Sequence, residues 1–292
     1  MLPRSMARTI SIVGAGRVGR ALGKRLRERG WRIGAVVTRS RATALAAVRA
    51  IGGGTAFSRI TGDALEADVI LLGTPDDVMR AAVRSLAEIG GSKCKGKVIL
   101  HTSATLDRTA LAPIARLGAA TGSLHPMQAF GGKVIPKLSE VVFAIEGDRK
   151  ARRVAQSIAR SLGGITVAID TGDKPIYHAA AVLAAGSAYP LIETGVQMLL
   201  RIGFTRRSAM QTLLPLIHQI LDNIERIGPR AAWTGPLSRG DYGIVARHAS
   251  ALRGYPREFR ESYAALALLA ARGLSENPAA ALKKTKRALE GR

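Results

Sequence analysis

The sequence predicts an α/β protein in which a doubly wound Rossmann sheet is followed by an all-α C-terminal domain. Three observations support this fold class. Near the start of the chain, a β-branched run over residues 9–13 ends in a Gly-x-Gly-x-x-Gly pattern. The next segment, residues 20–26, has apolar residues at helical spacing. Strand and helix patterns then alternate until about Gly172, and almost every later segment has a helical pattern.

The glycine-rich turn has the spacing of a dinucleotide-binding loop. Gly14 would allow the tight turn, Gly16 would let the backbone approach a pyrophosphate, and Gly19 would let the helix pack on the strand. The helix N-terminus, with the amides of Arg17 and Val18, would face the phosphates. The alternative is a structural turn without a nucleotide. The strand before the motif, and the helix and second strand after it, favour the dinucleotide.

The end of the second strand, residues 33–37, indicates which dinucleotide binds. An NAD site usually has Asp or Glu about 20 residues after the glycines, where it contacts the ribose hydroxyls. Here the segment reads Thr38, Arg39, Ser40, Arg41, with no carboxylate. Because two guanidiniums beside two hydroxyls suit a 2′-phosphate, we predict NADP(H) over NAD(H). The alternative is that both arginines are solvated surface charges.

Further strands and helices continue the alternation. Strands are expected at residues 55–57, 67–73, 97–103, 141–148 and 165–170, and helices at residues 43–51, 78–89, 108–117 and 149–162. In a doubly wound sheet, ligands bind beyond the carboxyl ends of the strands. The strand exits therefore add Gly73, Thr74, Pro75, Thr102 and Ser103 to the predicted cofactor site, with His101 as a further lining residue.

The C-terminal part has helical patterns at residues 176–185, 188–201, 205–226, 242–252 and 255–272, and residues 283–287 are expected to form a frayed basic helix. We place the domain boundary where the alternation stops. This gives a Rossmann dinucleotide-binding domain at 1–172 and an all-α substrate and dimerisation domain at 173–292. Wide apolar helix faces, for example at 179–185 and 213–220, predict a homodimer through the C-terminal domain.

Composition limits the partners. A net charge of +23 suggests nucleic acid, but the basic residues are dispersed and are not interleaved with aromatic residues, which form 4% of the chain. Attraction of anionic small molecules follows more directly than specific nucleic-acid binding. The single cysteine, Cys94, excludes an internal disulfide and fits a reducing compartment. No signal peptide, membrane-length apolar run or zinc-type cluster is expected, so we predict a cytoplasmic protein with no metal and no membrane partner.

Three segments carry a family resemblance: residues 123–130 (SLHPMQAF), 174–182 (KPIYHAAAV) and 234–241 (TGPLSRGD). A Rossmann domain followed by helices resembles the 6-phosphogluconate dehydrogenase-like superfamily, which includes β-hydroxyacid dehydrogenases and pyrroline-5-carboxylate reductase. Together, the three segments resemble an uncharacterised family of Rossmann-like NADP-binding oxidoreductases with a C-terminal domain of unknown function. The resemblance spans nearly the whole chain and implies the fold and the cofactor class, but no substrate.

His125 is the leading candidate for acid or base catalysis. It follows a predicted strand on the cofactor side, where residues 121–130 return toward the edge of the sheet, and Pro126 restricts the backbone after it. Prephenate dehydrogenases have a similar His-Pro segment whose histidine meets the substrate hydroxyl, so the resemblance implies the same role here. The alternative is that His125 only hydrogen-bonds a loop carbonyl and shapes the turn.

Lys174, Tyr177 and His178 are expected on one face of the first C-terminal helix, because residues at i, i+3 and i+4 share a face. β-Hydroxyacid dehydrogenases have a lysine proton donor near the start of this helix and an Asn one turn later. That resemblance implies a catalytic Lys174, but His178 stands where the Asn would be, so a Lys174/His178 pair is the expected substitute. Tyr177 is expected to contact substrate. The alternatives are a solvated helix start for Lys174, a packing role for Tyr177 and a hydrogen-bonded histidine at the domain interface for His178.

The loop at 234–241 interrupts the helical pattern with glycine and proline. Arg239 is predicted to hold a substrate carboxylate, and Thr234 and Ser238 to add hydrogen bonds. Asp241 is more simply the N-cap of the next helix.

These residues predict an NADP(H)-dependent oxidoreductase that transfers hydride to or from a small anionic substrate, a keto or hydroxy acid or an imino acid, in the inter-domain cleft. The alternative is an NADP(H)-binding sensor or scaffold module without turnover.

Overall fold

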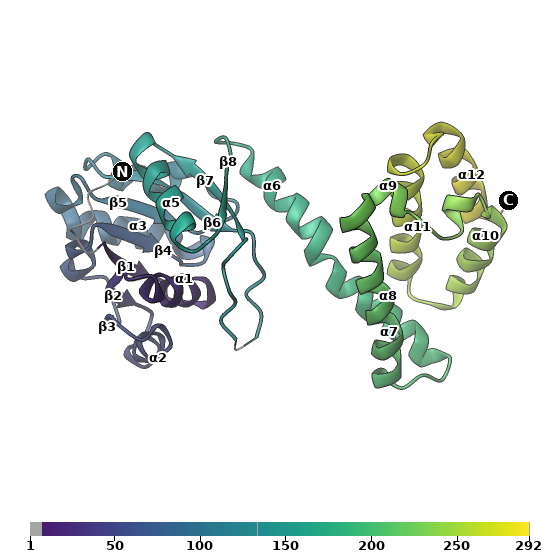
Figure 1. Ribbon diagram of the computed structural model, residues 1–292, viewed down its shortest axis with the longest axis horizontal. Coiled ribbons are helices and arrows are strands. Elements are labelled where there is room, and N and C mark those ends of the chain that lie inside the picture. Colours follow the sequence, from purple (N-terminus) through teal and green to yellow (C-terminus); the bar gives the residue numbers. More distant parts are fainter. Residues whose placement is uncertain (1–7, 133, 292) are drawn as a thin grey trace. The chain divides into compact units, whose positions relative to one another are not determined.

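A computed structural model describes residues 8–132 and 134–291 (Figure 1). The chain divides into two compact units, unit 1 at Met1–Ala184 and unit 2 at Ala185–Arg292. The sequence boundary at Gly172 marks the end of the strand–helix alternation, whereas the structural division falls later, within the helices that follow.

Unit 1 contains an eight-stranded sheet in the order β3-β2-β1-β4-β5-β6-β7-β8. The strands are β1 (Thr9–Val13), β2 (Arg32–Val37), β3 (Thr55–Phe57), β4 (Val69–Leu72), β5 (Val98–His101), β6 (Ala120–Pro126), β7 (Val142–Gly147) and β8 (Ile165–Ala168). Neighbouring strands are parallel except β6 and β7, which pair antiparallel. The mostly parallel Rossmann sheet is therefore as predicted.

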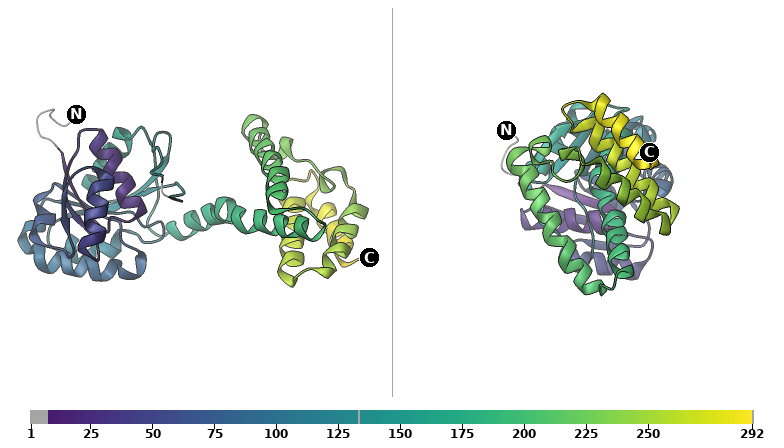
Figure 2. Two further views of the ribbon diagram at one scale, coloured as in Figure 1. Left: turned by 90° about the horizontal axis from the view of Figure 1, so that it is seen from below. Right: turned by 90° about the vertical axis from the view of Figure 1, so that its right-hand side faces the viewer.

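Helices α1 (Arg17–Glu28), α2 (Arg41–Ile51), α3 (Asp76–Gly90), α4 (Ala112–Ala115) and α5 (Arg149–Ser161) cover the two faces of this sheet, with 3-10 turns at Gly62–Glu66, Gly91–Cys94 and Arg108–Leu111. Helix α6 (Lys174–Ala181) follows β8 and extends away from the sheet (Figure 1). Leu22 and Leu26 of α1 share one buried cluster with Ile12 of β1 and Ile158 of α5, so α1 lies across one face (Figure 2). The α3 helix packs its own apolar residues on the other face.

The ends of two helices show how single residues determine where a helix begins or stops. Ser40 caps α2 by accepting a hydrogen bond from the Thr43 amide at 3.2 Å, and Gly52, with φ of 85°, ends that helix as predicted. The helix expected at 108–117 is instead a 3-10 turn followed by the single α-helical turn α4. Pro113, which has no amide hydrogen, stands in the first turn of α4 and cannot continue a helix from the preceding residues.

Unit 2 consists of helices in the described part of the chain: α7 (Ala188–Arg201), α8 (Arg206–Ile227), α9 (Pro229–Ala232), α10 (Tyr242–Ala251), α11 (Arg257–Gly273) and α12 (Pro278–Glu290), with 3-10 turns at Leu237–Arg239 and Leu252–Gly254. The expected fraying at 283–287 is wrong. Those residues lie within α12, whose buried Ala281, Thr285 and Ala288 recur at helical spacing. The lysines between them point away from this buried face.

One helical segment, Lys174–Arg201, is long and apolar enough to cross a membrane by length and composition alone, with a mean hydropathy of 1.3. The expectation that no apolar run reaches this length is therefore wrong. Within it, α6 is followed by a wider π-helical turn at Val182–Gly186 and then by α7.

Candidate active site

The glycine-rich turn has the backbone that a dinucleotide loop requires. Gly14 has φ of +85°, and a Cβ there would lie 2.5 Å from the Thr74 amide nitrogen. A Cβ at Gly19 would lie 2.8 Å from the Gly14 carbonyl oxygen, so α1 packs closely on the turn. A Cβ at Gly16 would meet nothing within 4 Å. Neighbouring backbone thus packs closely against the turn at Gly14 and Gly19, and the space beside Gly16 is open.

The first turn of α1 presents backbone donors beside this opening. Gly16 is the N-cap, and among the described residues no side chain caps the helix. Its first turn contains no acidic residue, so the amides of Arg17, Val18 and Gly19 retain their capacity to bind an anion. This geometry fits a pyrophosphate.

The segment after β2 contains two side chains that make local hydrogen bonds and two that are available to bind a ligand. Thr38 Oγ1 donates to the Ser40 carbonyl at 3.0 Å, and Ser40 is occupied by capping α2. Arg39 and Arg41 are exposed. Within the described chain, neither guanidinium makes a hydrogen bond. Both guanidiniums therefore fit the donor set that a 2′-phosphate needs.

The exit of β4 lies directly against the glycine-rich turn. A Cβ at Gly73 would lie 2.8 Å from the Gly14 carbonyl oxygen. Thr74 Oγ1 donates to Met79 Sδ at 3.5 Å, and Pro75 precedes α3 as its N-cap. At the next strand exit, Thr102 is buried and donates its amide to the Leu72 carbonyl at 3.0 Å. The predicted cofactor residues of β4 and β5 thus share one edge.

Ser103 connects this edge to α3 and α6. Its hydroxyl donates to Asp76 Oδ2 at 2.8 Å, and its carbonyl accepts from Lys174 Nζ at 2.9 Å. Thr105 Oγ1 donates to the same Asp76 oxygen at 2.5 Å. Lys174 is only 1% exposed. Burial lowers the pKa of Lys174 to about 8, although the Glu146, Asp107 and Asp76 carboxylates act in the opposite direction.

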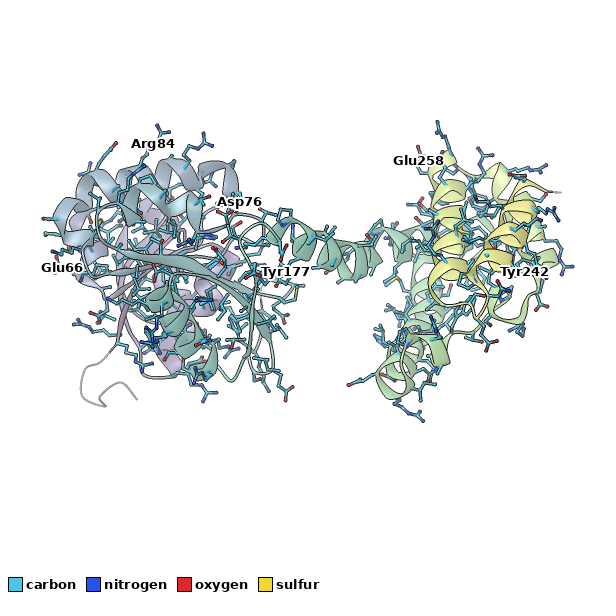
Figure 3. All side chains as sticks on the ribbon, turned by 90° about the horizontal axis from the view of Figure 1, so that it is seen from above. Glu66, Asp76, Arg84, Tyr177, Tyr242 and Glu258 are labelled. Atoms are coloured by element: carbon cyan, nitrogen blue, oxygen red, sulfur yellow. The ribbon has the colours of Figure 1, made fainter. Side chains whose placement is uncertain are left out.

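His125 and Tyr177 form the central pair of the site. His125 Nδ1 lies 3.0 Å from the Tyr177 hydroxyl, and the two rings meet edge to face with centroids 5.6 Å apart. His125 lies within β6 rather than after it, and Tyr177 is one helical turn beyond Lys174. Figure 3 shows Tyr177 and Asp76 at the end of unit 1 where α6 begins.

Burial sets the protonation of this pair. It lowers the pKa of His125 to about 4, with the positive charges of Lys174 and His178 as further causes. Burial also raises the pKa of Tyr177 to about 12. Both groups are therefore neutral near pH 7, and one hydrogen bond joins them, with Tyr177 or His125 as the donor according to the tautomer of the imidazole. His178 is half-buried, and within the described chain no hydrogen bond joins it to Lys174.

Two buried titratable residues support the same edge. Glu146 accepts hydrogen bonds from the Arg108 amide at 2.8 Å and from Thr171 Oγ1 at 3.0 Å. His101 Nε2 lies 3.1 Å from the Asp107 carbonyl. Burial, then the charge of Lys174, lowers the pKa of His101 to about 4. Sequence reasoning missed Glu146, whose signal is a lone carboxylate in the apolar strand at 141–147.

The structure brings His125, Lys174, Tyr177 and Ser103 together in unit 1. Thr234, Ser238 and Arg239 belong to unit 2. There, Ser238 Oγ donates to the Gly235 carbonyl at 2.8 Å, and Arg239 Nε donates to Asp241 Oδ2 at 3.1 Å. The predicted substrate roles of these three residues stay predictions.

Comparison with known families identifies two domains. Residues 4–126 match the Rossmann-like domain family, and residues 141–270 match the Domain of unknown function (DUF2520). The sequence has no significant match among curated proteins.

Solved structures share the fold over most of the chain. A reductive aminase from Aspergillus terreus, solved with NADPH and ethyl levulinate, has 16% identity and a TM-score of 0.70, covering 95% of this chain and 99% of its own. Protein TM1727 from Thermotoga maritima has 22% identity and a TM-score of 0.63, covering 96% and 98%. A pyrroline-5-carboxylate reductase from Coxiella burnetii has 15% identity and a TM-score of 0.58, covering 97% and 99%. At these identities the likeness establishes the fold.

Proposed function

Because the chain joins a Rossmann-like domain to a DUF2520 domain, we propose that it is an NADP(H)-dependent oxidoreductase that acts on a small anionic substrate, a keto or hydroxy acid or an imino acid. The observation that carries the proposal is the His125–Tyr177 pair, at 3.0 Å, in the same unit as the open glycine-rich turn. An acid–base pair and a dinucleotide loop are the two parts that hydride transfer with proton exchange requires. Distant structural similarity to NADPH-dependent reductases agrees with it.

The cofactor would be held by the chain's own backbone and guanidiniums. The amides of Arg17, Val18 and Gly19 face the opening at Gly16, where a pyrophosphate would bind. Arg39 and Arg41 supply positive charge for a 2′-phosphate. NADP(H), when bound, would supply or accept the hydride.

Tyr177 is the proposed proton donor in the reductive direction. With its pKa at about 12, the phenol stays protonated near neutral pH. It would yield its proton only to a more basic atom, such as the oxygen or nitrogen of a carbonyl or imine as its carbon is reduced. In the tautomer that has its proton on Nδ1, His125 would donate a hydrogen bond to the phenolate that forms, and a proton from solvent would restore the phenol. In the oxidative direction the phenolate would take the proton of the substrate hydroxyl or amine and later release it to solvent.

Lys174 has a different role in this proposal from the one that the resemblance to β-hydroxyacid dehydrogenases implied. Its ammonium is buried and donates to the Ser103 carbonyl. It therefore positions the first turn of α6, and with it Tyr177, rather than touching substrate.

The assembly and location belong to the same proposal. We propose a homodimer that buries apolar side chains of α6 to α8, such as Leu183 and Leu216, which are 67% and 59% exposed. We also propose a cytoplasmic protein, since the first turn of the apolar segment Lys174–Arg201 is tied to the sheet of unit 1 through Lys174 and Tyr177.

The experiment compares cofactor binding with turnover. NADPH is expected to bind more tightly than NADH, and Arg39→Ala with Arg41→Ala to weaken NADPH at least about tenfold while leaving NADH unchanged. Arg49→Ala, an exposed arginine at the end of α2, is the matched control.

Turnover is then followed as NADPH oxidation with a panel of 2-oxo acids and cyclic imines. Tyr177→Phe should lower kcat about a hundredfold or more with little change in NADPH affinity. Tyr189→Phe, at an exposed tyrosine of α7, should not. Binding of neither nucleotide contradicts the proposal; tight NADPH binding with no turnover of any class supports the sensor alternative.

A further inference from the structure

Unit 2 contains a hollow of about 900 Å³ that the proposed chemistry does not use. The junction of α8 and α9, the loop before α10 and the link between α11 and α12 line it. Its polar and aromatic lining includes Arg230, Trp233, Ser238, Arg239, Tyr242 and Glu276. The volume is in the range of sites for small organic molecules.

Two guanidiniums of this lining have N–H groups that are not used in strong hydrogen bonds. Arg239 Nε donates to Asp241 Oδ2 at 3.1 Å. Among the described residues, its terminal Nη groups have no hydrogen-bond partner. Within residues 8–132 and 134–291, the Arg230 guanidinium makes one hydrogen bond, a long one of 3.4 Å from Nη2 to the Gly273 carbonyl. An unoccupied pair of Nη groups is the geometry that binds a carboxylate through two parallel hydrogen bonds.

The aromatic residues give the hollow an apolar surface. Trp233 and Tyr242 are both half-buried, so each presents part of its ring. Lys284 Nζ lies 5.7 Å from the centroid of the Tyr242 ring and adds another positive charge nearby. Figure 3 labels Tyr242 on unit 2. The hollow thus combines cationic donors with flat apolar surface.

We propose that this hollow is a binding site for a small monocarboxylate with an aromatic or apolar body. Arg230 and Arg239 bind the carboxylate, and Trp233 and Tyr242 pack against the body. Glu276, an exposed carboxylate of the lining, repels anions and so lowers the affinity for the acid. The site is built from unit 2 alone and does not depend on hydride transfer in unit 1.

The chain offers an internal reporter for this site. It has two tryptophans, and the other one, Trp31, is buried in the core of unit 1. In the full-length Trp31→Phe variant, emission therefore comes from Trp233 alone. Phenylacetate is expected to change this emission with a saturating dependence, and the neutral isostere phenylacetamide to bind at least about tenfold more weakly.

Variants assign the effect to the lining. In the same background, Arg239→Ala and Arg230→Ala should each weaken phenylacetate about tenfold, Arg239→Lys should give an intermediate loss, and Glu276→Gln should tighten binding several-fold. Arg247→Ala, an exposed arginine of α10 outside the lining, is the control. Circular dichroism checks that each variant folds. Equal binding of acid and amide, arginine variants that bind like the control, or no change in Trp233 emission would overturn the proposal.

Discussion

At the scale of single residues, two buried histidines are the groups whose charge the fold opposes most clearly. His101 and His125 both have their pKa lowered to about 4, first by burial and then by the positive charge of Lys174. Each is held neutral by the sheet edge, and His125 is the one that contacts Tyr177. Protonation of either histidine is therefore less favourable in the folded protein than in the unfolded chain.

Stability should consequently fall as the solution is acidified. The unfolded histidines have a pKa near 6.5 and the folded ones near 4, so between these values the unfolded state binds more protons. Above pH 6.5 the free energy of unfolding has its full value. Between pH 6.5 and pH 4 it decreases by about 1.4 kcal/mol per pH unit for each histidine. Urea unfolding of wild type and of His125→Gln between pH 4 and pH 6.5 measures how much of this pH dependence comes from His125.

For His125→Gln, the slope of the free energy of unfolding against pH should be smaller than that of wild type by the equivalent of about one bound proton. His218→Gln, at an exposed histidine of α8, is the control and should keep the wild-type slope. Parallel slopes for wild type and His125→Gln would show that His125 is not held neutral by the fold.

Sequence reasoning reached some residue roles and missed others for a physical reason. Gly14 and Gly19 could be assigned because a turn with positive φ and a close helix–strand contact depend on local backbone alone. The contact of His125 with Tyr177 joins residues 52 positions apart, so only the sheet register and the start of α6 create it. Lys174 was expected to face the cleft or solvent, and its burial depends on Ser103, 71 residues away.

At the scale of elements, α6 is a helix that two side-chain hydrogen bonds tie to the sheet, and the one from Lys174 is fully buried. Lys174 in its first turn donates to the Ser103 carbonyl, and Ser103 is in turn bonded to Asp76 at the start of α3. Loss of the Lys174 ammonium leaves that carbonyl without its donor and releases the first turn of α6.

Lys174→Met should therefore speed amide hydrogen exchange in residues 177–181 by on the order of tenfold, because local opening of α6 becomes easier. Exchange in α3 and α5 should change much less. Lys150→Met is the matched control, because Lys150 Nζ also donates to a backbone carbonyl, that of Gly96, but from an exposed position. Unchanged exchange in α6 would show that other contacts hold the helix.

The order of elements was largely predictable, whereas their exact form was less so. The alternation of strand and helix follows from hydrophobic periodicity, which is a local property. The antiparallel pairing of β7 with β6 was not predicted, because strand direction depends on the path of the intervening loop. The ordered end of α12 was missed because its many lysines masked small buried residues, Ala281 and Ala288, whose burial requires α10 and α11.

At the scale of the whole molecule, the unpartnered apolar side chains are the feature to explain. Ile176, Leu183, Leu216 and Leu221 are each more than half exposed, on α6, the π-helical turn and α8. Side chains of this kind bury readily against a second copy. The same composition accounts for the membrane-like hydropathy of Lys174–Arg201.

The protein is therefore expected to sediment as a dimer at micromolar concentration. The double variant Leu216→Lys with Leu221→Lys should shift it toward monomer, because charges cannot be buried in an apolar interface without a partner. Leu45→Lys, at an exposed leucine of unit 1, should remain dimeric. A monomeric wild-type protein would contradict the proposed assembly.

The three glycines of the opening turn differ in what they tolerate, and this has a practical consequence. Methyl groups at Gly14 or Gly19 would collide with neighbouring backbone, whereas one at Gly16 would project into empty space. A methyl group can thus be added at Gly16 without meeting another atom of the chain within 4 Å. That position offers a way to obstruct nucleotide entry in a protein that still folds, and so to distinguish effects of the ligand from effects of the scaffold.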